Sequence, residues 1–175
     1  MKLKKIRIIN YRCFKDADID FDEHTTLIVG KNGAGKTAIL DAVAVAVSTF
    51  LLGINGGVSR SISKDDARYE FHDLDGTVDP QHQFPVSIES IGDCLDNHDV
   101  KWVRSLNSES GNTTIKEARE LTNISKETQK KIMTGDKSLI LPLISYYGTG
   151  RLYAQKKEKK NIKSLTEFKL SLIHI

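Results

Sequence analysis

The sequence has few cysteines and no long apolar run. Only two cysteines occur in 175 residues, Cys13 and Cys94, and neither belongs to a Cys-x-x-Cys pair or a Cys/His cluster. This usage argues against a disulfide framework or a zinc site and favours two reduced cytosolic thiols. The most apolar stretch, residues 42–54, is about 13 residues long, short of the roughly 20 that cross a bilayer, and we expect a buried helix there.

The sequence also lacks an excess of charge of one sign. It has 26 Lys and Arg against 23 Asp and Glu, a formal net charge of +3, which does not mark a nucleic-acid binder. The N-terminal residues read M-K-L-K-K-I-R, without the apolar segment and cleavage site of a secretory signal. We therefore expect a cytoplasmic protein with no membrane partner, and 39% hydrophobic residues suffice for one globular domain.

Apolar patterns in the first third of the chain predict a β-β-β-α order. Residues 3–10 and 17–21 alternate between apolar and charged side chains, which predicts an antiparallel strand pair joined by a short turn. The β-branched run at residues 25–29 predicts a buried strand. Residues 36–52 contain neither glycine nor proline and are rich in alanine and leucine, so a helix is predicted to follow.

Patterns in the rest of the chain are weaker. Trp102 is expected to anchor the packing of its strand. The charged segment at residues 114–133 is helix-prone, and it forms either one helix or two, the second capped by Ser125. The other expected elements are an exposed loop at 53–66 containing Asp65 and Asp66, and strands at 84–91, 100–106 and 139–147.

A glycine-rich loop carries the chemistry. Residues 30–37 read G-K-N-G-A-G-K-T and match G-x-x-x-x-G-K-[ST] at every fixed position, between an apolar strand and a helix. The glycines let successive amides turn inward around a phosphate, at the positive end of the helix. Lys36 is expected to reach the β- and γ-phosphates of ATP, and the Thr37 hydroxyl to ligate Mg²⁺; these two are the expected catalytic residues. The expected nucleotide-binding residues are Gly30, Lys31, Asn32, Gly33, Ala34, Gly35, Lys36, Thr37 and Ala38.

The loop reads G-x-N-G-x-G-K-T and resembles that of the ABC-type ATPase heads of the RecF and SMC-like families. Residues 9–14, I-N-Y-R-C-F, look like the N-terminal N-F/Y-R-x-F element of those heads, and residues 37–43 look like their post-loop helix. The resemblance is strong over residues 1–52. It implies an α/β P-loop NTPase fold, here the N-terminal lobe of a head with a mixed central sheet and a small antiparallel sheet.

The same resemblance implies partners and further contacts. ATP would sit between the two heads of a homodimer, with DNA or a nuclease as a possible further partner. Arg12 would approach the nucleotide; its alternative is a surface arginine at a strand end. Residues 141–152 are similar to an element of bacterial predicted AAA or ABC-like ATPases that include the ATPase subunit of Septu-type phage-defence systems. Arg151 there would contact nucleotide or the partner head, or brace its own loop.

Parts of the hydrolytic machinery of these families are missing. The sequence has no apolar run ending in Asp-Glu, no Leu-Ser-Gly-Gly signature and no suitable glutamine, Gln155 being a poor candidate. Without that carboxylate pair nothing orients the attacking water, so the chain alone is predicted to be inactive. We interpret residues 1–169 as a truncated ATPase domain. Residues 170–175, whose coding string resembles a transposon-end adapter, are interpreted as a non-native tail.

Three functions are compatible with these observations. The first is an ATP-binding lobe of an ATPase head whose parent couples ATP hydrolysis to DNA repair or anti-phage defence. The second is a regulatory nucleotide-binding module without turnover. The third is a nucleic-acid-binding fragment that uses the lysine-rich run at residues 156–163, whose ordinary explanation is a solvated surface.

Overall fold

The computed structural model describes residues 1–74, 77–136 and 139–148. The chain divides into one compact unit of residues 1–142 and a second unit of residues 143–175. Four features of the sequence lie outside the described residues: Arg151, Gln155, the run at 156–163 and the tail at 170–175.

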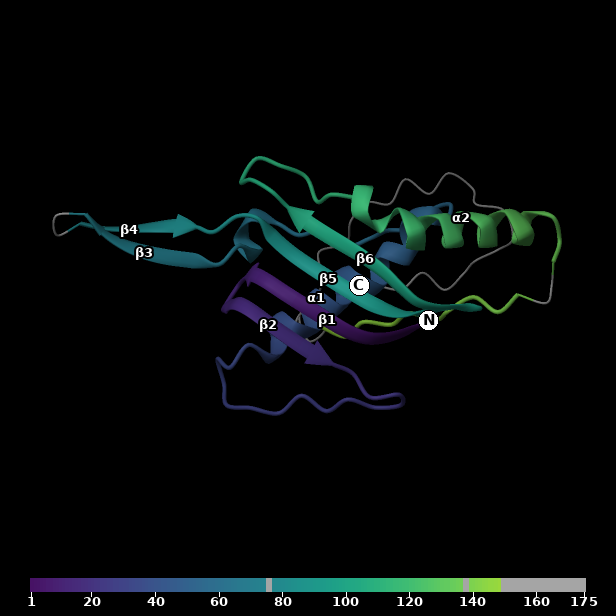
Figure 1. The fold of residues 1–175 in the computed structure, drawn as a ribbon, viewed down its shortest axis with the longest axis horizontal. Coiled ribbons are helices and arrows are strands. Elements are labelled where there is room, and N and C mark those ends of the chain that lie inside the picture. Colours follow the sequence, from purple (N-terminus) through teal and green to yellow (C-terminus); the bar gives the residue numbers. More distant parts are fainter. Residues whose placement is uncertain (75–76, 137–138, 149–175) are drawn as a thin grey trace, which may run out of the picture. The chain divides into compact units, whose positions relative to one another are not determined.

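A four-stranded antiparallel sheet forms the centre of the larger unit (Figure 1), in the order β2-β1-β5-β6. Its strands are β1 (Lys2–Tyr11), β2 (Phe14–Asp20), β5 (Val86–Cys94) and β6 (Asn97–Leu106). Ile8 of β1 lies opposite both Ala17 of β2 and Ile88 of β5. The strand pair predicted from alternating side chains at residues 3–10 and 17–21 is therefore confirmed. The strands predicted at 84–91 and 100–106 are also confirmed, and both extend further into the turn between them than predicted.

One face of this sheet forms the core. Ile6, Ile8 and Ile88 on that face are fully buried, and Trp102 of β6 is 1% exposed. The indole N–H of Trp102 donates a hydrogen bond of 3.0 Å to the backbone oxygen of Ala46, which satisfies its only donor. Trp102 thus joins the sheet to the helix, and the prediction that it anchors the packing of its strand is confirmed.

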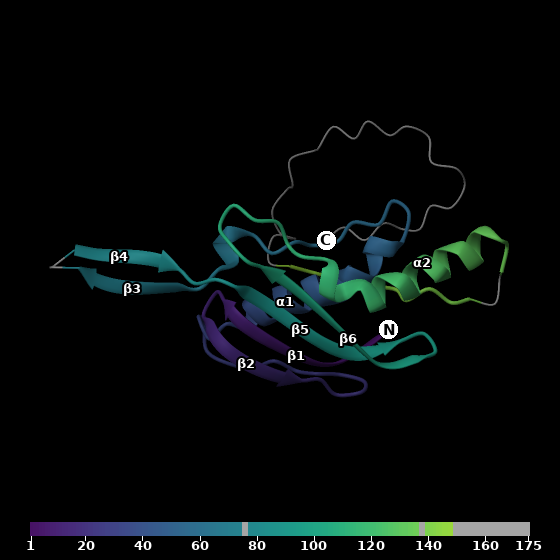
Figure 2. The same ribbon diagram turned by 45° about the horizontal axis from the view of Figure 1, so that its top comes forward.

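The buried face of the sheet is covered by α1 (Lys36–Ser48) (Figure 2), which continues as the 3-10 helix η1 (Thr49–Gly53). The helices α1 and η1 together agree with the helix predicted at residues 36–52. Together, Lys36–Gly53 form an 18-residue helical stretch that is apolar enough to cross a membrane by length and composition, and 56% of it is buried inside the protein. Ala42, Val45 and Ala46 have no exposed surface, so α1 is the central helix of the core.

A second helix, α2 (Arg119–Met133), follows the short 3-10 helix η3 (Lys116–Ala118) and packs against η1 and β6. It is a single helix, so the alternative in which Ser125 caps a second helix is wrong. Ser125 is fully buried, and its hydroxyl donates to the backbone oxygen of Thr122 at 2.9 Å. A Cβ added to Gly53 would lie 1.9 Å from Ser125 Oγ, so α2 crosses η1 where only glycine fits.

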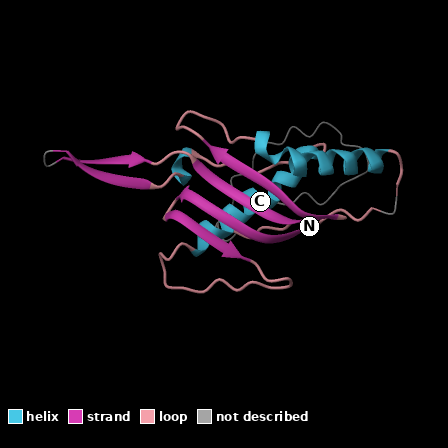
Figure 3. Cartoon of the chain, viewed as in Figure 1, coloured by secondary structure: helices cyan, strands magenta, loops and turns pink. Residues whose placement is uncertain are grey.

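A two-stranded hairpin extends away from the four-stranded sheet (Figure 3), preceded by the 3-10 helix η2 (Lys64–Asp66). Its strands, β3 (Tyr69–Leu74) and β4 (Thr77–His82), were not predicted. They contain aspartate, histidine and proline, residues that are depleted in strands or carry no β signal. Tyr69 and His82 lie opposite each other in the two strands, and their ring centroids are 4.0 Å apart.

Two predicted strands are absent from the described residues: 25–29 and 139–147 have no regular structure. Leu27 is 81% exposed, Val29 77% and Ile140 85%, so the expectation of a buried strand leading into the glycine-rich loop is wrong here. A strand requires a hydrogen-bonded neighbour, and the sheets of the described residues pair neither segment. Apolar residues alone therefore do not make these segments strands.

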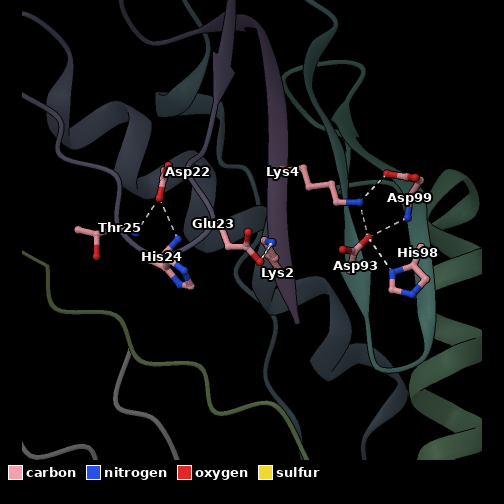
Figure 4. Close-up of polar contacts among 9 residues, drawn as sticks. All are labelled: Lys2, Lys4, Asp22, Glu23, His24, Thr25, Asp93, His98 and Asp99. Carbon is pink, nitrogen blue, oxygen red and sulfur yellow. Dashed lines mark hydrogen bonds and ion pairs between the residues drawn. The ribbon is translucent and has the colours of Figure 1, made fainter.

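The turn at Asp22 sets the start of the first of these segments (Figure 4). The Asp22 carboxylate accepts hydrogen bonds from the backbone N–H groups of His24 at 3.0 Å and Thr25 at 3.4 Å. These bonds lower the pKa of Asp22. Glu23 beside it pairs with Lys2 at 2.8 Å. The chain thus leaves β2 through a local polar turn and continues without regular structure to the loop.

Candidate phosphate-binding site

The site is built on the first turn of α1. Gly35 is the N-cap residue in the left-handed region, with φ 87° and ψ 8°. No side chain of the described residues caps this end of the helix, and its first turn has no acidic residue. Since the first amides of a helix lack internal partners and carry partial positive charge, this end of α1 is suited to bind an anion.

Two glycines give the preceding loop its shape. Gly33 has φ 83°, like Gly35 a conformation that other residues rarely adopt. The backbone N–H of Ala34 donates to the oxygen of Lys31 at 3.2 Å and closes a turn. A Cβ on Gly30 would lie 3.3 Å from that of Ala34. The loop is therefore a tight backbone turn in which glycine is required for conformation at residues 33 and 35.

Lys36 lies across this loop. Its ammonium group donates to the backbone oxygens of Gly30 at 2.8 Å and Lys31 at 2.7 Å. An ammonium has three donors, so a phosphate oxygen can take the third or replace a carbonyl. Thr37, the next residue, is exposed, whereas the side chain of Ala38 is 5% exposed and belongs to the core. Ala38 can therefore offer a ligand only its backbone N–H.

Arg12, in the turn between β1 and β2, binds two carboxylates. Its guanidinium lies 2.5 Å from the carboxylate of Asp41 in α1 and 2.8 Å from that of Asp66 in η2. Its backbone N–H donates to the backbone carbonyl oxygen of Asp66 at 2.7 Å. Burial alone lowers the pKa of Arg12, but nearby Tyr11, Asp66 and Asp41 raise it above its ordinary value. Arg12 is thus a side chain anchored to α1 and to η2, and its contact with nucleotide stays a prediction.

Sequence reasoning missed the partners of Arg12. Asp41 is 5% exposed and also pairs with Arg60 at 3.0 Å. Asp66 is 7% exposed, so the prediction that Asp66 lies in an exposed loop is wrong. The signal for Asp41 was present: a single acid in the apolar helix sequence T-A-I-L-D-A-V. A carboxylate on the buried side of a helix requires a cation. Nothing local to the sequence indicates that Asp66 supplies the second carboxylate.

These residues fit a magnesium-bound polyphosphate. The loop combines an uncapped helix start, left-handed glycines and an ammonium group, all suited to an anion. Within the described part of the chain, no three His, Cys, Asp or Glu converge as a metal site. In this loop, the Thr37 hydroxyl is the side-chain oxygen that would hold magnesium beside the phosphate oxygens.

Comparison with known proteins places the chain in a family. A family model described as an AAA domain matches residues 5–174 of the 175. The chain belongs to this AAA-domain family. The prediction of an α/β fold of the P-loop NTPase class is confirmed, as is the resemblance to RecF/SMC-like ATPase heads. The mixed central sheet expected from that resemblance is not found among the described residues, whose sheets are antiparallel throughout.

Several curated proteins resemble parts of this AAA-domain chain. The DNA double-strand break repair Rad50 ATPase of Archaeoglobus fulgidus is 50% identical over 44 residues, 25% of this chain and 5% of that protein. The DNA replication and repair protein RecF of Flavobacterium johnsoniae is 49% identical over 43 residues, 25% of this chain and 12% of its own length. RecF of Actinobacillus pleuropneumoniae is 32% identical over 117 residues, 64% of this chain and 29% of RecF.

The AAA-domain chain thus spans less than a third of the length of these relatives. Among solved structures, a chain from work on ATP-driven dimerization and DNA-stimulated activation of SMC ATPases aligns with a TM-score of 0.45 and 19% identity. That alignment covers 81% of this chain and 87% of the other.

Proposed function

We propose that this chain binds MgATP at residues 30–37 as part of an ATPase head whose parent protein couples ATP binding and hydrolysis to DNA repair. The observation that carries the proposal is the uncapped start of α1, with Gly35 left-handed at its N-cap and Lys36 lying across the loop. That arrangement binds polyphosphate through backbone amides, helix charge and one mobile cation.

Each residue has a defined task in this proposal. The backbone amides of the loop and of the first turn of α1, including that of Ala38, surround the phosphates. Lys36 exchanges a carbonyl oxygen for a phosphate oxygen, and Thr37 ligates Mg²⁺, which neutralises the phosphate charge that grows during transfer. Arg12 reaches the nucleotide if one of its carboxylates releases it. Because no Asp-Glu pair follows an apolar run, the chain alone binds ATP without turning it over.

The parent's role follows from the relatives. Rad50 and RecF are named for DNA repair, and we propose repair, through a cytoplasmic homodimer of heads with DNA or a nuclease as partner. The resemblance of residues 141–152 to Septu-type ATPases makes phage defence the alternative pathway. In the same proposal the ATPase domain covers residues 1–169, and 170–175 are a non-native tail.

Among the described residues, the outer face of the sheet offers little to a nucleic acid. Arg7 binds Asp16 through two hydrogen bonds of 3.0 and 2.8 Å, and Lys5 lies 3.2 Å from Asp18. Cations already paired to carboxylates contribute less to phosphate binding, which depends on neutralising phosphate charge. These pairs argue against a nucleic-acid site on this face of the sheet; the lysine-rich run at residues 156–163, on which the nucleic-acid alternative depends, lies outside the described residues.

Calorimetric titration of the 175-residue chain with ATP and Mg²⁺ tests the proposal. Lys36→Ala should weaken binding by about 10- to 100-fold, because a hydrogen bond from a charged donor is worth about 1.5–3 kcal/mol. Lys101→Ala, an exposed lysine on the outer face of the sheet, is the matched control and should bind like the wild type.

Two results would contradict the proposal. Equal affinity of folded Lys36→Ala and wild type would remove the role of that ammonium group. Steady ATP turnover that Lys36→Ala abolishes would show that the chain carries a water-orienting group that we have missed.

A further inference from the structure

The turn between β1 and β2 contacts the phosphate loop itself. A Cβ built on Gly35 would lie 2.6 Å from Cζ of Phe14 and 2.7 Å from Sγ of Cys13. These two side chains therefore occupy the space beside the α-carbon of Gly35. We propose that Phe14 and Cys13 are positioning residues that hold the loop in its phosphate-binding conformation, an inference that rests on the function proposed above.

Gly35 is the point at which the loop most needs such support. The backbone carbonyl oxygen of Gly35 accepts the first hydrogen bond of α1, from the backbone N–H of Ile39 at 3.0 Å. The backbone angles of Gly35 therefore set the direction of the first helical amides. Glycine reaches left-handed and extended conformations at similar cost. A neighbour that fills the adjacent space is therefore needed to select one of them.

The turn that carries Phe14 is itself fixed. Arg12 binds Asp66 through its backbone and side chain, and it binds Asp41 in the second turn of α1. Phe14 is half-buried and packs on the edge of the hydrophobic core. The turn thus holds α1 at two places, by an ion pair at Asp41 and by side-chain contact at Gly35.

Loss of the Phe14 ring should lower nucleotide affinity without unfolding the protein. Apparent affinity falls in proportion to the fraction of molecules whose loop is ready to bind. If Phe14→Ala reduces that fraction to about a tenth, the dissociation constant rises about tenfold. Phe14→Leu keeps part of the contact and should show a rise of about threefold, so affinity should follow the order Phe, Leu, Ala.

The test is titration of the 175-residue chain and its variants with ATPγS and Mg²⁺. Phe71→Ala is the matched control, because Phe71 lies on β3 and is 72% exposed; its affinity should equal that of the wild type. Alkylation by iodoacetamide gives a second readout, since Cys13 is exposed and Cys94 is buried. In Phe14→Ala, Cys13 should react faster than in wild type while Cys94 stays protected.

Each outcome has one meaning. An unchanged dissociation constant in Phe14→Ala, with Cys94 protected, overturns the positioning role and leaves ATP binding intact. Wild-type protein that binds no ATPγS refutes the proposed function, and the positioning role with it. If Phe14→Ala exposes Cys94 and is therefore unfolded, Phe14→Leu decides: a threefold loss supports the inference, and wild-type affinity overturns it.

Discussion

The buried ion-pair cluster of Arg12, Asp41, Arg60 and Asp66 yields a quantitative prediction. Asp41 is 5% exposed and lies between two guanidinium groups, at 2.5 Å from Arg12 and 3.0 Å from Arg60. Asp41→Asn keeps the shape of the side chain and removes its charge. Arg12 and Arg60 both lose the carboxylate that they share at Asp41, and the variant should be less stable than the wild type.

The magnitude follows from burial. Breaking a fully buried pair costs about 3–5 kcal/mol. The Arg12 side chain is 31% exposed and that of Arg60 is 28% exposed, so solvent screens part of this cost and we expect about 2–3 kcal/mol. For a chain of this length, that is a fall of roughly 4–12 °C in the unfolding midpoint. Such a loss is small enough for the variant to remain folded.

Urea and thermal unfolding measure this difference. Asp16→Asn is the matched control, because Asp16 binds Arg7 through two hydrogen bonds on the exposed face of the sheet. Solvent screens exposed pairs, so they contribute little to stability and the control should change little. Equal losses in the two variants would refute the reasoning, because burial would then not distinguish the pairs.

Two further predictions concern acid stability and helix contact. Lys4 holds the pKa of Asp93 at about 2, below its ordinary 3.8; the stability this provides is present above the ordinary pKa and is lost as pH falls through about 2. The free energy of unfolding of Asp93→Asn, measured with denaturant, should therefore depend less steeply on pH between about 4 and 2 than that of the wild type. The same slope in both proteins would argue against a contribution of the Lys4–Asp93 pair. Gly53→Ala places a methyl group against Ser125 and should cost about 1–3 kcal/mol in thermal unfolding; wild-type stability would show that α2 shifts freely.

The sequence alone determined the elements whose signals are local. Alternating side chains located β1 and β2, an alanine-rich segment without glycine or proline located α1, and the loop at residues 30–37 was found from its motif. These signals depend on backbone conformation and side-chain periodicity, which neighbouring residues set. The left-handed angles of Gly33 and Gly35 agree with the reason given for glycine there.

Only the tertiary structure decided which segments acquire partners. Residues 25–29 have the composition of a buried strand, yet Val29 is 77% exposed, because strand formation depends on a neighbour. Asp66, in a polar segment, is buried because η2 places it beside Arg12. The contact of Phe14 with Gly35 joins residues whose spacing carries no signal. Hydrogen bonding between segments, ion pairing and close packing depend on distances through space, which sequence patterns do not record.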